Sequence, residues 1–171
     1  MKQYDQGFWT VDFPDGWIVQ DDDFPITFLD EQGDWAIQIS HYLKEPAAVT
    51  HSDLEEFIAD IEKVGCVKKG ITTPNAKGLQ VEFTDRENTL WRHTLLRSGH
   101  IMLYITYNVN KDGRQLPEGS FRGFLESIQI KGKPAAPPDR VPPPIKWTLS
   151  TNDKEGVYDG ERENEKGGSV Q

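Results

Sequence analysis

The segment LWRHTLLRSGHIMLYITYNV, residues 90–109, predicts two antiparallel β-strands joined by a tight turn. Apolar and polar side chains alternate on both sides of Ser98 and Gly99, which is the period of a half-buried strand. Gly99 provides the positive φ that a two-residue hairpin turn requires. With these two residues as the turn, Arg97 pairs with His100, and the register of the whole ladder is fixed.

This register gives the hairpin one apolar face and one mixed face. The apolar face pairs Leu90, Arg92, Thr94 and Leu96 with Tyr107, Ile105, Leu103 and Ile101. The mixed face pairs Trp91, His93, Leu95 and Arg97 with Thr106, Tyr104, Met102 and His100. We predict that the apolar face belongs to the core, with Arg92 as its one charged member. The mixed face is either a binding surface or a surface covered by a helix.

A second strand-turn-strand pattern lies near the N-terminus, in DFPDGWIVQDDDF, residues 12–24. The Pro-Asp-Gly sequence at 14–16 supplies the fixed φ, the capped bend and the permissive backbone of a tight turn. A strand therefore begins at Trp17, and extended segments follow at 24–29 and, with alternating apolar side chains, at 35–40. The five carboxylates of residues 12–24 are interpreted as the solvated rim of this sheet.

Two helices are predicted, separated by further strands such as that at 79–84. Residues 52–55, SDLE, match a capping box, in which Ser52 and Glu55 satisfy backbone donors at a helix start. The helix carries Leu54, Phe57, Ile58 and Ile61 on one face. Gly65 is a typical stop signal. The second helix opens at Pro117 and Glu118 and carries Phe121, Phe124, Leu125 and Ile128 at helical spacing. It ends near Ser127, and a short strand at 128–130 follows.

The composition divides the chain into one domain and an extension. Residues 1–130 have the size and apolar content of a single α+β domain. Residues 131–150 form an extension that holds the Pro-rich segment KPAAPPDRVPPP, for which polyproline II is expected. The apolar island at 145–149 either docks on the domain, with Trp147 buried, or binds a partner. Residues 151–171 lack periodicity, and we expect them to be disordered.

The net charge of −9 is unevenly distributed along the sequence. Residues 1–62 carry 15 acids against 2 bases, whereas residues 63–130 carry 6 acids against 10 bases. Nucleic acid is not expected as a partner, because binding to phosphates needs a clustered basic surface. An acidic surface speeds the encounter with a basic protein. The acidity therefore indicates a basic protein partner, or it serves solubility alone.

The sequence indicates neither a membrane protein nor a secreted one. No run of about 18 apolar residues is present, and the first residues lack both the basic start and the apolar stretch of a secretory signal. A single cysteine, Cys66, is incompatible with an internal disulfide. We expect a cytoplasmic protein without a membrane partner.

Motifs for metal, cofactor and catalytic chemistry are missing from the sequence. The four histidines show no zinc-ligand spacing, and the acidic segments at 21–23 and 30–34 do not match a calcium loop. There is no GxSxG elbow, P-loop or dinucleotide-binding glycine pattern. We therefore predict no metal, no cofactor and no enzymatic activity. A nucleophile such as Ser98 or Cys66 beside a distant histidine stays open.

Three segments together resemble the PsbP-like fold family: FPDGW at 13–17, RHTLLRSGHIMLYITYNV at 92–109 and FRGFLESIQI at 121–130. The resemblance implies a curved antiparallel β-sheet flanked by helices, an α/β/α sandwich, over residues 7–130. It also implies a family whose better-understood members bind other proteins, and whose bacterial relatives include immunity or secretion-accessory proteins. The photosynthetic members work after import, for which this sequence carries no transit segment.

Two functions are compatible with these observations. The first is a non-catalytic protein-binding or accessory module, with Trp17, Trp91, His93 and Tyr104 as binding residues, because aromatic groups beside charges are typical of interface hot spots. The alternative is a small hydrolase or small-ligand-binding domain with a pocket between sheet and helix.

Overall fold

The computed structural model describes residues 1–61, 66–109, 113–131 and 146–149. Two helices, α1 (His51–Ala59) and α2 (Glu118–Ser127), accompany the strands. The strands are β1 (Lys2–Asp5), β2 (Trp9–Phe13), β3 (Trp17–Gln20), β4 (Ile26–Asp30), β5 (Trp35–Glu45), β6 (Val67–Thr72), β7 (Lys77–Thr84), β8 (Leu90–Ser98), β9 (Ile101–Val109), β10 (Gln129–Ile130) and β11 (Lys146–Leu149).

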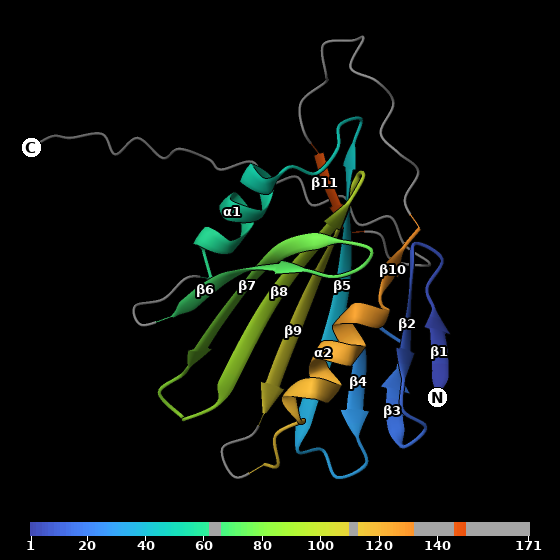
Figure 1. Ribbon diagram of the computed structural model, residues 1–171, viewed down its shortest axis with the longest axis vertical. Helices are drawn as coiled ribbons and strands as arrows, with labels where there is room; N and C mark the ends of the chain where they lie inside the picture. The colour runs from blue at the N-terminus through green and yellow to red at the C-terminus, as the bar shows by residue number, and fades with distance from the viewer. Residues whose placement is uncertain (62–65, 110–112, 132–145, 150–171) are drawn as a thin grey trace, which may run out of the picture.

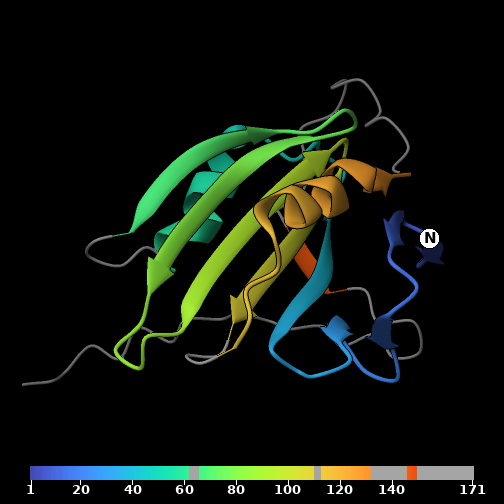
Figure 2. The ribbon, with the colours of Figure 1, turned by 60° about the horizontal axis from the view of Figure 1, so that its bottom comes forward.

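The main sheet is antiparallel and has the strand order β3-β4-β5-β9-β8-β7-β6, with β11 paired to β5 beside it. A smaller sheet has the order β1-β2-β10 and lies next to the β3 edge (Figure 1). The strands of the main sheet curve, and α1 and α2 lie on opposite faces of it (Figure 2). The chain therefore has an α+β fold in which a mostly antiparallel sheet lies between two helices.

Each face of the sheet has its own apolar cluster. Under α2 and the small sheet, the buried residues include Trp9, Phe28, Trp35, Tyr107 and Phe121. Under α1, they include Leu54, Ile58, Val81, Leu95 and Met102. The predicted apolar stripe of the first helix thus faces the sheet, with Leu54 and Ile58 fully buried.

Arg92, predicted as the charged member of the core face, lies on the α2 side of the sheet. Its guanidinium pairs with two glutamates and lies beside the ring of Phe121. Its Nε donates to Glu82 at 2.5 Å, its Nη1 donates to Glu118, and its guanidinium lies 5.4 Å from the ring centroid of Phe121. Burial opposes the charged form of Arg92, but the hydrogen bonds to Glu118 and Glu82 outweigh it and raise the pKa. This position on the core face therefore holds an arginine whose charge is paired with Glu82 and Glu118.

The hairpin register differs from the predicted one by two residues. The turn consists of Gly99 and His100, and Leu96 pairs with Leu103 rather than with Ile101. Gly99 has φ +58° at the first central position, which is where a type II′ turn places glycine. Because side chains alternate with a period of two, a two-residue shift leaves every residue on its predicted face. His93 consequently lies opposite Thr106, not Tyr104.

The first helix begins two residues before the predicted position. Thr50 is its N-cap, and the capping box joins Thr50 to Asp53 instead of joining Ser52 to Glu55. The carboxylate of Asp53 also accepts two hydrogen bonds from Lys44 Nζ, at 2.7 and 2.8 Å. Two overlapping capping boxes are possible here, Thr50–Asp53 and Ser52–Glu55. The contact of Asp53 with Lys44 on β5, which a local sequence pattern cannot show, favours the first. The helix ends at Ala59, and the predicted stop at Gly65 lies outside the described residues.

Two strands, β1 and β6, were not predicted from the sequence, because both are mostly exposed and neither shows an apolar alternation. The apolar island pairs with β5 as β11, so its backbone docks on the domain. The side chain of Trp147 and the remaining residues of the predicted extension and tail, 132–145 and 150–171, lie outside what the structure describes.

Candidate functional site

The four predicted binding residues lie in two separate places. Trp91, His93 and Tyr104 are on the α1 face of the sheet, whereas Trp17 packs with the cluster on the α2 face. Their assignment as binding residues stays a prediction, but the structure shows that they do not form one surface.

On the α1 face, the three predicted residues belong to an aromatic stack centred on His93. The imidazole lies parallel to Phe83, Trp91 and Tyr104, with ring centroids 5.4, 5.9 and 5.8 Å away. Its Nδ1 lies 2.6 Å from the Tyr104 hydroxyl, and Trp91 Nε1 donates to Asp85 at 2.9 Å. Of these four rings only His93 is buried, whereas Phe83, Trp91 and Tyr104 are half-buried.

Helix α1 covers part of the same stack. Phe57 lies 5.2 Å from the ring centroid of Tyr104 and 5.4 Å from that of Tyr42. Burial, with a smaller contribution from Tyr42, raises the pKa of Tyr104 to about 12. Its phenol therefore stays neutral near pH 7. The stack is partly covered by α1, with His93 buried and the other three rings half-buried.

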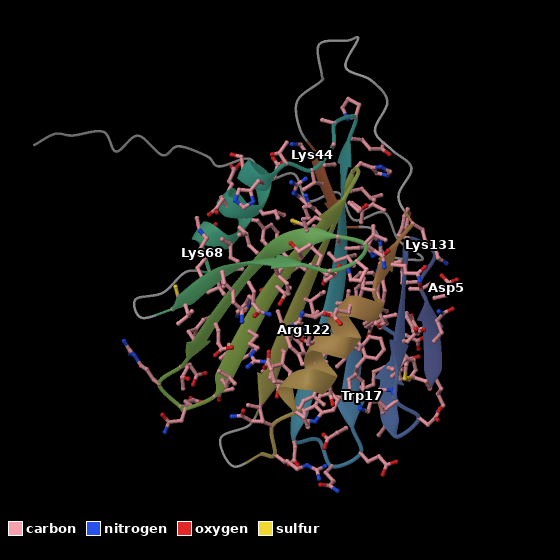
Figure 3. The ribbon with its side chains drawn as sticks, in the orientation of Figure 1. Asp5, Trp17, Lys44, Lys68, Arg122 and Lys131 are labelled. Atoms are coloured by element: carbon pink, nitrogen blue, oxygen red, sulfur yellow. The ribbon has the colours of Figure 1, made fainter. Side chains whose placement is uncertain are left out.

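Trp17 lies beside a pocket of about 490 Å³ at one end of the sheet. We call it the Trp17 pocket. Three segments build it: the turn between β2 and β3, the turn between β4 and β5, and residues 114–117 before α2. These segments meet at the lower end of the molecule in Figure 1, and Figure 3 shows Trp17 beside the lower part of α2. Its lining includes Gly16, Trp17, Asp30, Glu31, Trp35 and Arg114.

The pocket has an aromatic wall. The ring centroids of Trp17 and Trp35 lie 4.6 Å apart with an interplanar angle of 66°, and Trp17 also lies 5.4 Å from Phe124. Trp35 is buried, whereas Trp17 is half-buried. The segment before α2 is anchored because the Leu116 backbone N–H donates to the Tyr107 hydroxyl at 3.0 Å. Contacts with buried aromatic residues therefore hold both the indole wall and the segment before α2.

Two carboxylates lie against this wall. Asp30 is 8% exposed, and its Oδ1 accepts from the backbone N–H groups of Asp34 at 2.7 Å and Trp35 at 3.4 Å. Its Oδ2 is buried without a hydrogen-bond partner among the described residues. A Cβ placed on Gly16 would lie 3.8 Å from Glu31 Oε1, so this carboxylate reaches the opposite turn. Exposed Arg114 adds a positive charge to the lining.

A second, smaller cleft of about 250 Å³ lies between β6, β7 and the outer side of α2. Its lining mixes Lys69 and Arg122 with Glu118 and Glu126, and Arg122 is already paired with Glu126 at 2.7 Å. Among its described lining residues there is no histidine or cysteine. This cleft lies where the alternative function expects a pocket between sheet and helix, so that alternative stays a prediction.

The described parts of the chain contain neither a cluster of metal ligands nor a helix that could span a membrane. Within residues 1–61, 66–109, 113–131 and 146–149, no three His, Cys, Asp or Glu side chains group together as metal ligands. No helix in those same ranges is long and apolar enough to cross a bilayer.

Sequence reasoning found Trp17 but missed the pocket around it. From the sequence, Trp35 is placed in a strand, and Asp30 and Glu31 are considered only within an acidic segment that does not match a calcium loop. The signal that could have grouped them is the pairing of β3 with β4, which places Trp17 opposite Asp30. That pairing follows from the two consecutive turns, but the contribution of Arg114 comes from a segment about 80 positions further along the sequence.

Comparison with known proteins gives a fold and no sequence family. No protein-family model and no curated protein matches the chain. A crystal structure from Bacteroides thetaiotaomicron matches with a TM-score of 0.55 and 12% identity, covering 77% of this chain and 49% of that one. The chain thus spans about half the length of that protein.

The solution structure of cyanobacterial PsbP (CyanoP) from Synechocystis matches with a TM-score of 0.52 and 12% identity. The match covers 75% of this chain and 91% of that one. These similarities confirm the predicted α+β, PsbP-like fold. At 12% identity they show the fold alone.

Proposed function

We propose that this protein is a non-catalytic binding module for a basic partner protein, and that the Trp17 pocket is its contact site. The observation that carries the proposal is the pairing of a preformed aromatic wall, Trp17 on Trp35, with the carboxylates of Asp30 and Glu31. Aromatic anchors that fill or line pockets supply much of the energy of protein interfaces. An immunity or secretion-accessory role would be one form of such binding.

The charges around the pocket support a basic partner. Residues 1–35 carry 9 acids and 1 base, and they include two of the three segments that build the pocket. Complementary charge steers the encounter and suppresses wrong partners. The aromatic stack around His93 supports the proposal less, since its central side chains already contact one another and α1.

The test is quantitative affinity capture from the source cells with the tagged full chain. Glu31→Arg reverses an exposed charge at the pocket, and Glu87→Arg makes the same change in an exposed turn between β7 and β8. We expect a partner that the wild type and Glu87→Arg recover equally and that Glu31→Arg loses. Equal recovery by all three proteins, or no specific partner with any of them, would contradict the proposal.

A further inference from the structure

We infer that the Trp17 pocket receives one cationic side chain, Lys or Arg, of the partner protein, held between the indoles and the carboxylates of Asp30 and Glu31. The inference rests on the proposed function, since it names the group that the partner inserts. It is nevertheless testable with small probes that do not require the partner.

The aromatic wall favours a cation. The negative face of an indole attracts an ammonium or guanidinium placed within about 6 Å of the ring centroid, and Trp is the best residue for this contact. Trp17 is half-buried, so part of its ring remains accessible beside the pocket. Trp35 and Phe124 hold that ring at centroid distances of 4.6 and 5.4 Å. The acceptor surface therefore exists before the ligand arrives.

The carboxylates favour a cation more strongly. Asp30 is 8% exposed, and the Oδ2 of its carboxyl group has no hydrogen-bond donor among the described residues. A buried charge that lacks a compensating partner raises the free energy of the folded protein, and a cation nearby lowers it. The Glu31 carboxylate also lines the pocket and lies close to Gly16. An anionic ligand would meet two negative charges here, and an apolar one would leave Asp30 uncompensated.

Arg114 sets the position of the ligand within the pocket. It belongs to the segment before α2, whereas Asp30 ends β4 and Glu31 begins the turn that follows. Its positive charge repels a second cation, so the ligand's charge must lie toward Asp30 and Glu31. The volume of about 490 Å³ lies within the range of ordinary ligand pockets and leaves room for one long side chain beside Arg114.

The test uses the full chain and NMR of the indole Nε1–H groups of Trp17 and Trp35. The probes are N-acetyl-arginine amide and N-acetyl-lysine amide, and the neutral controls are the citrulline and norleucine analogues. We expect saturable shifts of both indole signals with a cationic probe, and binding of the matching neutral analogue that is weaker by about tenfold or more. Equal binding of cationic and neutral probes, or no indole shift with either cation, would overturn the inference.

Three substitutions test which part of the pocket holds the cation. Glu31→Gln and Asp30→Asn each remove a carboxylate, and each should weaken cation binding about tenfold. The side-chain oxygen of Asn can still accept the backbone hydrogen bonds that Asp30 Oδ1 accepts. The control Glu87→Gln should leave cation binding unchanged. Arg114→Gln should strengthen it. If Asp30→Asn does not fold, as judged by its amide spectrum, Glu31→Gln carries the test. Unchanged affinity in Glu31→Gln would contradict the inference.

The two proposals can fail separately. If the capture experiment returns a partner that depends on Glu31 but no cationic probe binds, the side-chain assignment is wrong and the protein-binding function stands. If the cationic probes bind as expected but no partner is captured, the pocket chemistry stands and the proposed function is wrong.

Discussion

At the scale of single residues, His41 has surroundings that oppose a charge. It is fully buried on the α2 face of β5, with the rings of Phe8 and Phe24 at centroid distances of 5.0 and 5.2 Å. Neither ring nitrogen has a hydrogen-bond partner within the described part of the chain. Burial lowers the pKa of His41 to about 4, because the imidazolium would lose its hydration without compensation. The folded protein therefore holds His41 neutral well below the ordinary pKa.

This environment predicts a pH dependence of stability. Between the unfolded pKa of about 6.5 and the folded pKa of about 4, the unfolded chain binds a proton at His41 and the folded chain does not. The free energy of unfolding should fall as pH drops through this window, by about 1.4 kcal/mol per pH unit from this residue. His41→Leu should remove that slope in urea titrations at several pH values. His51→Gln, which alters an exposed imidazole, should retain it, and a wild-type slope in His41→Leu would refute the assignment.

A second residue-scale feature is the close approach of β7 to β8 at Gly78. A Cβ at this position would lie 1.7 Å from the backbone oxygen of Leu95 and 2.8 Å from its carbonyl carbon. Backbone atoms in the middle of a ladder cannot move aside as a flexible side chain can. Glycine in a strand interior often marks such an approach.

Gly78→Ala should therefore lower the free energy of unfolding by about 3 kcal/mol or more, as overpacking does. The matched control is Gly70→Ala on the neighbouring strand β6, where a new Cβ meets nothing within 4 Å. That change should stay within about 0.5 kcal/mol of the wild type. Urea denaturation of both variants checks the prediction, and equal stability of the two would show that the strands are spaced differently.

Among the elements, α1 is positioned by a cap that is also an ion pair. Asp53 accepts from the Thr50 backbone N–H at 2.6 Å, while Lys44, 5% exposed on β5, donates to the same carboxylate. Burial alone would raise the pKa of Asp53, but the hydrogen bonds from Lys44 and Thr50 outweigh it, and the pKa is lowered. The start of the helix is thereby tied to the centre of the sheet.

The two overlapping capping-box matches make different predictions for mutations. Thr50→Ala removes the hydroxyl that accepts from the Asp53 N–H and should cost about 1 kcal/mol of stability. Ser52→Ala removes an exposed hydroxyl within the first turn and should change stability by less than about 0.5 kcal/mol. Thermal or urea unfolding of the pair distinguishes them. A larger loss in Ser52→Ala would restore the helix start predicted from the sequence.

The same comparison shows what local patterns can and cannot predict. The strands with an apolar alternation, such as β8 and β9, were predicted, and their faces survived a two-residue error in register because the period is two. The helix start at Thr50 could not be chosen, since the deciding contact is with Lys44 of another element. The polar strand β6 gave no pattern at all.

The candidate site was predictable only in part for the same reason. Trp17 could be identified as an aromatic residue beside a turn, and the acidity of its surroundings could be counted. Its contact with Trp35 can be predicted only once the strand order β3-β4-β5 is known. The place of Arg114 in the lining depends on the path of the chain after β9, which the sequence does not reveal. By contrast, Trp91, His93 and Tyr104 did come together, but as a packed stack partly covered by α1.

At the scale of the whole molecule, the strand order places the acidic N-terminal strands and the more basic later strands in different halves of the sheet. Strands β3, β4 and β5 from the acidic part of the chain occupy one side of the sheet, and β9, β8, β7 and β6 occupy the other (Figure 1). Helix α1 is the exception, because its acids lie near the basic strand β6, where Glu55 contacts Lys68. Acids therefore outnumber bases around β1–β4 and the Trp17 pocket, although Asp5 pairs with Lys131 and Asp15 with the N-terminal ammonium.

This distribution predicts how salt affects binding of a basic peptide, for which an alternating Arg-Gly decapeptide is a suitable probe. The Debye length shrinks from about 30 Å at 0.01 M salt to about 3 Å at 1 M, so the long-range attraction is screened and the association rate should fall about tenfold or more. The dissociation rate, set by short-range contacts in the pocket, should change little with salt and rise in Glu31→Gln. Stopped-flow tryptophan fluorescence measures both rates. A salt effect confined to dissociation would mean that the acidic half does not steer the encounter, since steering acts before the contacts form.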